Sequence, residues 1–100
     1  MDIQVTQAGQ EATIVFKGSF AIAVAQRVRK TLQAVLQKGA KTLTIDFSGV
    51  DYIDSSSIAT FIELLQKLQA NGGSMRIVGA STRVREIFDL MGLTPLFAFD

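Results

Sequence analysis

Apolar residues open the chain in two short runs with the character of β-strands. Residues 3–6 and 12–16 are rich in β-branched and aromatic side chains, and the polar stretch 7–10 separates them. Such a pattern predicts an antiparallel hairpin that ends near Gly18.

The spacing of apolar residues then changes to a helical period. Between residues 22 and 37 they recur every three or four positions, and Gly39 follows where a helix would stop. We therefore predict a helix over 22–37. Residues 42–47 are dense in β formers, which predicts a central strand buried on both faces.

The second half of the chain repeats this alternation. A broad apolar stripe predicts a helix over 55–70, closed by the Asn-Gly-Gly sequence at 71–73, and 75–78 reads as a strand. A third helix is predicted to begin at Ser81 or Thr82. It is followed by a stop signal at Gly92 and Pro95 and a short last strand over 96–99.

The predicted order β-β-α-β-α-β-α-β defines the fold class. Strands that alternate with helices favour an α/β fold with a small, mixed, mostly parallel sheet of four to five strands, to which the opening hairpin adds an antiparallel pair. The length of 100 residues and a hydrophobic content of 48% are those of one domain, over residues 1–100.

The residue types that the chain lacks restrict its chemistry. It contains neither cysteine nor histidine, so it cannot form a disulfide, a thiolate zinc site, or a Ser-His-Asp or Cys-His catalytic group. We therefore expect a protein that is not an enzyme. Ten basic residues against nine acidic ones leave no basic excess for nucleic acid. We see neither a secretion signal nor an apolar run long enough to insert into a membrane, and expect a cytoplasmic protein.

The sequence YIDSSSIATF at 52–61 sets three serines at the start of the second predicted helix. Asp54 suits the N-cap, where a carboxylate accepts a backbone N–H bond. Helical geometry directs Ser56 away from the apolar stripe, so we predict that Ser56 faces solvent. We expect the small residues Ala59 and Thr60 beside it on the exposed face, where they would let another protein approach the hydroxyl.

The other two serines have different expected positions. Ser57 lies at the boundary of the apolar stripe, and Ser55 is close enough to the cap to bond to the backbone. From spacing alone, two interpretations stay open: the serines serve only as helix caps, or one of them accepts a phosphoryl group.

Other candidate sites are weaker. Three carboxylates, Asp46, Asp51 and Asp54, could be grouped as a Mg²⁺ site, but we expect them on a strand, in a turn and at a helix cap. Residues 71–74 follow a helix and precede a strand, the reverse of the order that a phosphate-binding loop requires. We therefore predict no metal and no cofactor.

The order of elements, with DFSGVDYIDSSS at 46–57 leading into an amphipathic helix, resembles the STAS domain of bacterial anti-sigma factor antagonists. The segment MRIVGASTRVREIFDLMGL at 75–93 supports the resemblance, which extends over nearly the whole chain. It implies a sheet with helices packed mainly on one side. It also implies that the second hydroxyl residue of the Asp-Ser-Ser motif, Ser56 here, is phosphorylated, with Ser57 and Ser55 as the less favoured acceptors.

The resemblance implies a mechanism of partner switching. The unphosphorylated protein would bind an anti-sigma factor with a histidine-kinase-like ATPase fold and so free a sigma factor. Phosphorylation by that partner would release it, and a serine phosphatase would reset the cycle.

Two positions depart from the family pattern. Ser57 stands where the family most often has glycine, and residues 18–21 lack the acid that often ends the family's Gly-x-Leu-Asp loop. The apolar run 20–25 is longer than one helix face needs, so Phe20 belongs either to an exposed interaction patch or to the core.

We accordingly predict a STAS-type regulatory binding protein and a partner-binding surface at two places. These are the residues before the first helix and those at the start of the second: Ser19, Phe20, Ala21, Asp54, Ser55, Ser56, Ser57, Ala59 and Thr60. Two alternatives stay open, namely a STAS subunit that binds the ATPase of a lipid-transport ABC system, and a STAS regulator in another signalling assembly.

Overall fold

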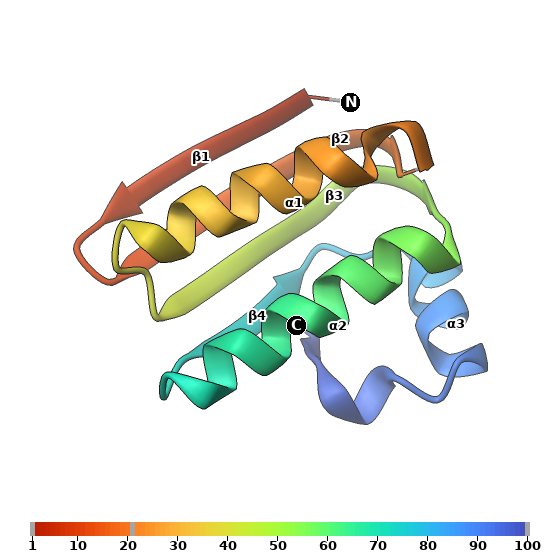
Figure 1. Cartoon of the computed structure of the whole chain (residues 1–100). Coiled ribbons are helices and arrows are strands. Elements are labelled where there is room, and N and C mark those ends of the chain that lie inside the picture. The colour runs from red at the N-terminus through yellow and green to blue at the C-terminus, as the bar shows by residue number, and fades with distance from the viewer. Residues whose placement is uncertain (1, 21, 100) are drawn as a thin grey trace.

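The computed structural model describes residues 2–20 and 22–99, except for the side chains of residues 22, 23, 96 and 98. The elements follow the predicted order (Figure 1). A short 3-10 helix that includes residue 96 comes before the last strand, which is therefore shorter than the predicted range 96–99. They are β1 (Asp2–Ala8), β2 (Glu11–Phe20), α1 (Ile22–Gln37), β3 (Thr42–Ile53), α2 (Ser55–Ala70), β4 (Ser74–Val78), α3 (Thr82–Leu90), η1 (Thr94–Leu96) and β5 (Ala98–Phe99).

The five strands form one sheet in the order β1-β2-β3-β4-β5. The first pair is antiparallel, joined by a two-residue turn that begins at Gly9 (φ 60°), and the other three pairs are parallel. The predicted fold class and the central place of β3 are confirmed.

Strands β2 and β3 both continue past their predicted ends. Gly18, expected to end β2, adopts a φ of 118° within it, and the strand runs on to Phe20. Two register shifts, between Val15 and Lys17 and between Gly18 and Ser19, keep the two strands paired as far as Ile53. The polar sequence after Phe47 therefore remains in the sheet, although it reads as a turn when taken alone.

The helices cover one face of the sheet, and α1 and α2 lie side by side across it (Figure 1). Residues along β3 accordingly alternate: Leu43, Ile45 and Phe47 are buried, whereas Thr42 and Ser48 are exposed. The prediction that this strand is buried on both faces is wrong, because the other face of the sheet has no covering layer among the described residues.

Four phenylalanine rings form the centre of the core beneath the first half of α2. They are Phe16, Phe20, Phe47 and Phe61, and every pair of their ring centroids lies 5.0 to 6.1 Å apart. All four side chains are fully buried. Tilted and edge-to-face pairs of this kind add to the free energy of burial, so the cluster fixes α2 on β2 and β3.

Candidate functional site

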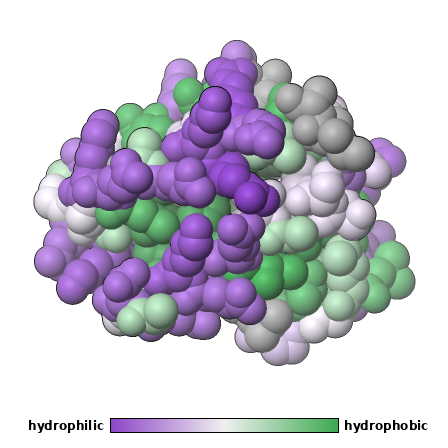
Figure 2. Space-filling model, viewed as in Figure 1, coloured by the Kyte–Doolittle hydropathy of each residue, from purple (hydrophilic) through white to green (hydrophobic). Residues whose placement is uncertain are grey.

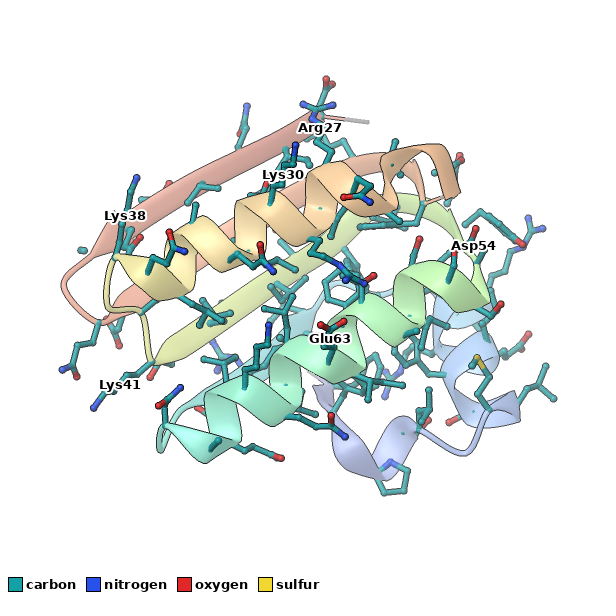
Figure 3. All side chains as sticks on the ribbon, in the orientation of Figure 1. Arg27, Lys30, Lys38, Lys41, Asp54 and Glu63 are labelled. Carbon is teal, nitrogen blue, oxygen red and sulfur yellow. The ribbon has the colours of Figure 1, made fainter. Side chains whose placement is uncertain are left out.

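The serine motif lies where β3 ends and α2 begins. Asp54 has an extended backbone (φ −95°, ψ 171°), and its Oδ1 accepts the N–H of Ser57 at 2.9 Å. The predicted N-cap is confirmed. The Ser56 hydroxyl donates to the same carboxylate oxygen, also at 2.9 Å. One carboxylate thus caps the helix and orients Ser56. Figure 3 shows Asp54 at this end of α2.

Ser56 is half-buried, so the prediction that it faces solvent is wrong. Its side chain turns back to Asp54 instead of extending outward. Ser55 and Ala59 are exposed on either side of it, which leaves an approach to the hydroxyl open.

Thr60 does not lie on the exposed face either. It is only 2% exposed, and its hydroxyl donates to the Ser56 carbonyl at 3.3 Å. The physical reason is that α2 packs against α1 as well as against the sheet, which buries a wider stripe than helical spacing indicates. A partner surface therefore has no access to the Thr60 side chain.

Ser57 is fully buried, and its Oγ has no hydrogen-bond partner among the described residues. The sequence placed it at the boundary of the stripe, but its side chain lies inside. A kinase cannot reach this hydroxyl while the first turn of α2 is folded. The side chain also does not obstruct the approach to Ser56.

The residues before α1 divide between the core and the surface. Phe20 belongs to the buried aromatic cluster, so the exposed-patch interpretation of this residue is wrong. Ala21 lies outside the described residues. Ser19 is exposed, and its hydroxyl donates to Asp51 Oδ1 at 2.6 Å.

Asp51 is a residue of this surface that sequence reasoning missed. It was expected in a turn, but it lies on β3, next to the residue that pairs with Ser19. A carboxylate is therefore present beside Ser19, although the segment 18–21 lacks one. Only the pairing of β2 with β3 could have revealed this neighbour. Tyr52, adjacent in sequence, is 43% exposed.

Asp46, the third aspartate near the serine motif, is held by hydrogen bonds from a residue close to it in the sequence. Asp46 accepts hydrogen bonds from the hydroxyl of Ser48 at 2.6 Å and from its N–H at 2.8 Å. These two bonds hold the pKa of Asp46 below its ordinary value of 3.8, with a smaller contribution from Lys17. No group of three potential metal ligands occurs among the described residues.

The surface around α3 is more apolar than that around the first two helices. Figure 2 shows polar side chains over α1 and α2 and apolar ones over α3. Leu90, which is 88% exposed, and Met91, which is 43% exposed, end this helix. Helix α3 packs on β3, the strand that leads into Asp54. This strand therefore connects the apolar surface around α3 to the serine motif.

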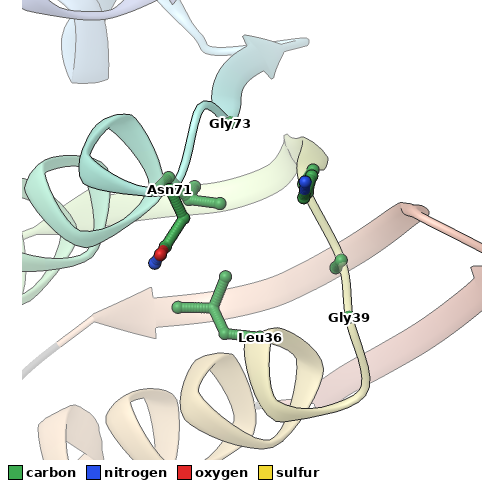
Figure 4. A pocket seen from close by; sticks show the side chains of 7 residues that line it. Leu36, Gly39, Asn71 and Gly73 are labelled. Atoms are coloured by element: carbon green, nitrogen blue, oxygen red, sulfur yellow. The ribbon is translucent and has the colours of Figure 1, made fainter.

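A pocket of about 300 Å³ lies between the C-terminal ends of α1 and α2 (Figure 4). Leu36, Ala40, Leu68 and Asn71 contribute to its walls, and Lys41 is its one charged lining residue. It lies at the opposite end of α2 from Ser56 and offers no group that would act on the hydroxyl.

Within the described part of the chain, no helix is both long and apolar enough to cross a membrane.

Comparison with known proteins identifies the class to which this fold and this site belong. The family model of the STAS domain matches residues 2–100, and the chain is a member of the STAS domain family.

Named relatives are similar over most of their length. The anti-sigma-B factor antagonist of Staphylococcus epidermidis is 27% identical over 79 residues, which cover 79% of this chain and 73% of that protein. The anti-sigma-B factor antagonist of Staphylococcus aureus is 23% identical over 96 residues, which cover 96% of this chain and 89% of that protein.

Solved structures share the fold at lower identity. An anti-sigma factor antagonist from Mycobacterium paratuberculosis superposes with a TM-score of 0.86 at 20% identity, covering 98% of this chain and 83% of that one. The Bacillus cell fate determinant SpoIIAA in its phosphorylated form gives a TM-score of 0.78 at 19% identity, with coverages of 99% and 91%.

Proposed function

We propose that this chain is an anti-sigma factor antagonist that works by partner switching through Ser56. The observation that carries the proposal is the arrangement at the start of α2, where the Ser56 hydroxyl is held by Asp54 between two exposed small residues. The names of the Staphylococcus relatives and the phosphorylated state of SpoIIAA support it.

The covalent step is transfer of a phosphoryl group from ATP. Ser56 Oγ forms a bond to the γ-phosphorus, and the bond from that phosphorus to the bridging oxygen of the β-phosphate breaks. ADP leaves with the electron pair of that bond, and the hydroxyl proton passes to water. An anti-sigma factor with a histidine-kinase-like ATPase fold supplies the ATP site. A serine phosphatase later returns the hydroxyl by hydrolysis. The protein itself acts as a cytoplasmic regulatory binding protein and not as an enzyme.

Three serines compete for this role, and their surroundings favour one. Ser57 is enclosed. Ser55 is exposed but lacks the contact with Asp54 that fixes Ser56. A hydroxyl held in one orientation loses less conformational freedom when the reacting groups align. Ser56 is therefore the acceptor.

Release follows from the charge of the phosphate. About two negative charges would be added to Ser56 within contact distance of the Asp54 carboxylate. The helix N-terminus tolerates an anion, so the domain stays folded. A partner packed closely over Ser55, Ser56 and Ala59 would have to desolvate both charges, which opposes binding.

The binding surface continues from α2 onto the neighbouring strand ends. Ser19 and Asp51 present a hydrogen-bonded polar pair, and Tyr52 adds an exposed aromatic ring before Asp54. Aromatic side chains are enriched at protein interfaces, and an exposed carboxylate favours a basic group on the partner.

The test is an affinity capture from a lysate of the native host with four baits: the parent, Ser56→Ala, Ser56→Asp and the matched control Ser55→Asp. We expect the parent, Ser56→Ala and Ser55→Asp to retain a histidine-kinase-like ATPase that Ser56→Asp loses. Mass spectrometry is expected to locate phosphate on Ser56 of parent protein incubated with the captured ATPase and ATP. Equal capture by Ser56→Asp and the parent would show that charge at Ser56 is not the switch. Capture of an ABC-transporter ATPase by all four baits would identify a transporter subunit instead.

A further inference from the structure

The outer edge of β1 is an unprotected strand edge. β1 is the first strand of the sheet, so one of its edges pairs with β2 and the other faces away from the sheet (Figure 1). It is seven residues long, contains no proline, lysine or arginine, and pairs with β2 without a register shift. Prolines, lysines and bulges are the features that usually keep edge strands from pairing with other molecules. This edge has none of them.

The hairpin turn determines which backbone groups point to that edge. Residues 9 and 10 form a two-residue turn, so Ala8 and Glu11, which flank it, form a hydrogen-bonded pair. Hydrogen-bonded and non-hydrogen-bonded pairs alternate along an antiparallel ladder. The even-numbered residues of β1 therefore bond to β2. The N–H and C=O groups of Ile3, Val5 and Gln7 point to the outer edge, where they have no backbone partner among the described residues.

The same three residues direct their side chains toward the helix-covered face. Their partners on β2 are Phe16, Ile14 and Ala12, all of which are buried. Val5 is nevertheless 44% exposed, because no strand of the described residues continues the sheet beyond it. The free edge thus combines unpaired backbone groups with an exposed apolar side chain at its midpoint.

We propose that β1 is a self-association edge, at which two copies of the chain pair antiparallel about a twofold axis through Val5. In this register, Val5 lies opposite Val5 of the second copy, and Ile3 lies opposite Gln7. Each of these pairs is of the hydrogen-bonded type and exchanges two N–H···O=C bonds. A register shifted by two residues loses one such pair and moves Val5 off the axis.

The charges and the shape of the edge fit this arrangement. Asp2, the one charged residue of β1, falls opposite Ala8 of the second copy and has Lys17 as its own cross-strand neighbour. Like charges therefore do not face each other. A hollow of about 520 Å³ lined by Val5, Gln7, Gly9 and Lys38 borders the edge, at the place where Ile3 of the second copy would lie.

The contact is small, which determines how it should be measured. One strand on each copy buries less surface than a standard interface, so we expect association that depends on protein concentration, with a Kd of about 0.1 to 1 mM. Pairing extends the sheet of each copy and leaves α2, with Ser56, on the helical face away from the edge (Figure 1).

Disulfide trapping tests the register. Because the chain has no cysteine, Val5→Cys adds one thiol per copy, and two such thiols meet on the axis. Hydrogen-bonded antiparallel pairs have Cα atoms about 5.5 Å apart, within the range of a disulfide. The matched control is Ala8→Cys, which is exposed on the same strand but lies opposite Asp2. We expect Val5→Cys to form a disulfide-linked dimer about tenfold faster than Ala8→Cys. Equal rates would overturn the register.

Sedimentation equilibrium tests the association itself. The parent, Val5→Lys and the control Thr13→Lys, which adds the same charge at an exposed position on β2, are compared up to about 1 mM. We expect the parent and Thr13→Lys to shift toward the dimer mass. Val5→Lys should remain a monomer, because two lysines would face each other across the axis. Circular dichroism verifies that each variant is folded. A monomeric parent, or a Val5→Lys variant that dimerises like the parent, would overturn the proposal.

Discussion

Three adjacent serines differ in environment at the residue scale. Ser55 is exposed, Ser56 is half-buried and bonded to Asp54, and Ser57 is enclosed with no partner for its Oγ in the described part of the chain. A single turn of helix therefore gives three chemically equal side chains three different accessibilities. The sequence predicted that the three were not equivalent, but it placed Ser56 too far outside and Ser57 not far enough inside.

Ser57→Ala is expected to stabilise the protein. The buried hydroxyl of Ser57 has no hydrogen bond to any described residue, so its removal eliminates a desolvation penalty and the free energy of unfolding should rise by about 1 kcal/mol. Urea denaturation measures the change. The control Ser55→Ala, at an exposed position, should alter stability by less than about 0.5 kcal/mol. A loss of stability in Ser57→Ala would mean that the hydroxyl has a partner in solution.

Ser48→Ala should raise the pKa of Asp46 toward 3.8, because the largest cause of its lowered pKa is the hydrogen bond from the Ser48 hydroxyl. A carboxyl whose pKa is lower in the folded state stabilises the fold above its unfolded pKa. That stabilisation is lost as the pH falls through the folded pKa. The difference between parent and variant should therefore be present at neutral pH and vanish in acid. An NMR titration of the Asp46 carboxyl checks this, and an unchanged pKa would contradict it.

The central element is α2, which joins the site to the core. Asp54 caps its first turn, while Phe61 in the second turn belongs to the buried aromatic cluster. Glu63 contacts Arg29 of α1 at 3.2 Å and Lys67 at 3.9 Å, and all three side chains are about half exposed. Such pairs contribute little, so burial and the cap determine the position of the helix.

Replacement of the cap is expected to weaken this element. Asp54→Ala should lower the free energy of unfolding by about 1 kcal/mol, because the N–H of Ser57 loses its acceptor. Asp54→Asn keeps an acceptor oxygen and should have a smaller effect. Urea denaturation of the two variants measures the difference, and equal losses would show that the charge, and not the hydrogen bond, holds the turn.

Helices were easier to predict from this sequence than strand ends. The predicted bounds 22–37 and 55–70 coincide with α1 and α2, since an apolar stripe and its stop signals are local. The extension of β3 to Ile53 depends on register shifts in its neighbour β2, which no local pattern records. The burial of Thr60 likewise depends on the packing of α1 against α2, and the contact of Ser19 with Asp51 on strand pairing.

At the scale of the whole molecule, core and site are adjacent. Phe20 comes directly after Ser19 on β2, and the two residues face the core and the surface respectively. The aromatic cluster thus supports both parts of the proposed binding surface. A variant at this surface can therefore lose binding either because a contact is removed or because the support beneath it is.

Phe20→Ala tests whether the core supports this surface. The loss of a fully buried ring from the cluster should lower the free energy of unfolding by about 3 to 5 kcal/mol. Tyr52→Ala, at a 43% exposed position on the same surface, should cost less than about 1 kcal/mol. Thermal and urea denaturation of both variants check this. A small effect of Phe20→Ala would show that Phe20 lies at the surface and not in the core.

The most direct test of partner switching is the affinity of the captured anti-sigma factor for protein that carries phosphoserine at position 56. The comparison uses unphosphorylated protein and a control with phosphoserine at position 55. Partner switching predicts binding weaker by about 100-fold or more for the protein modified at Ser56, with an unchanged circular dichroism spectrum. Equal affinity of the anti-sigma factor for all three forms would contradict it.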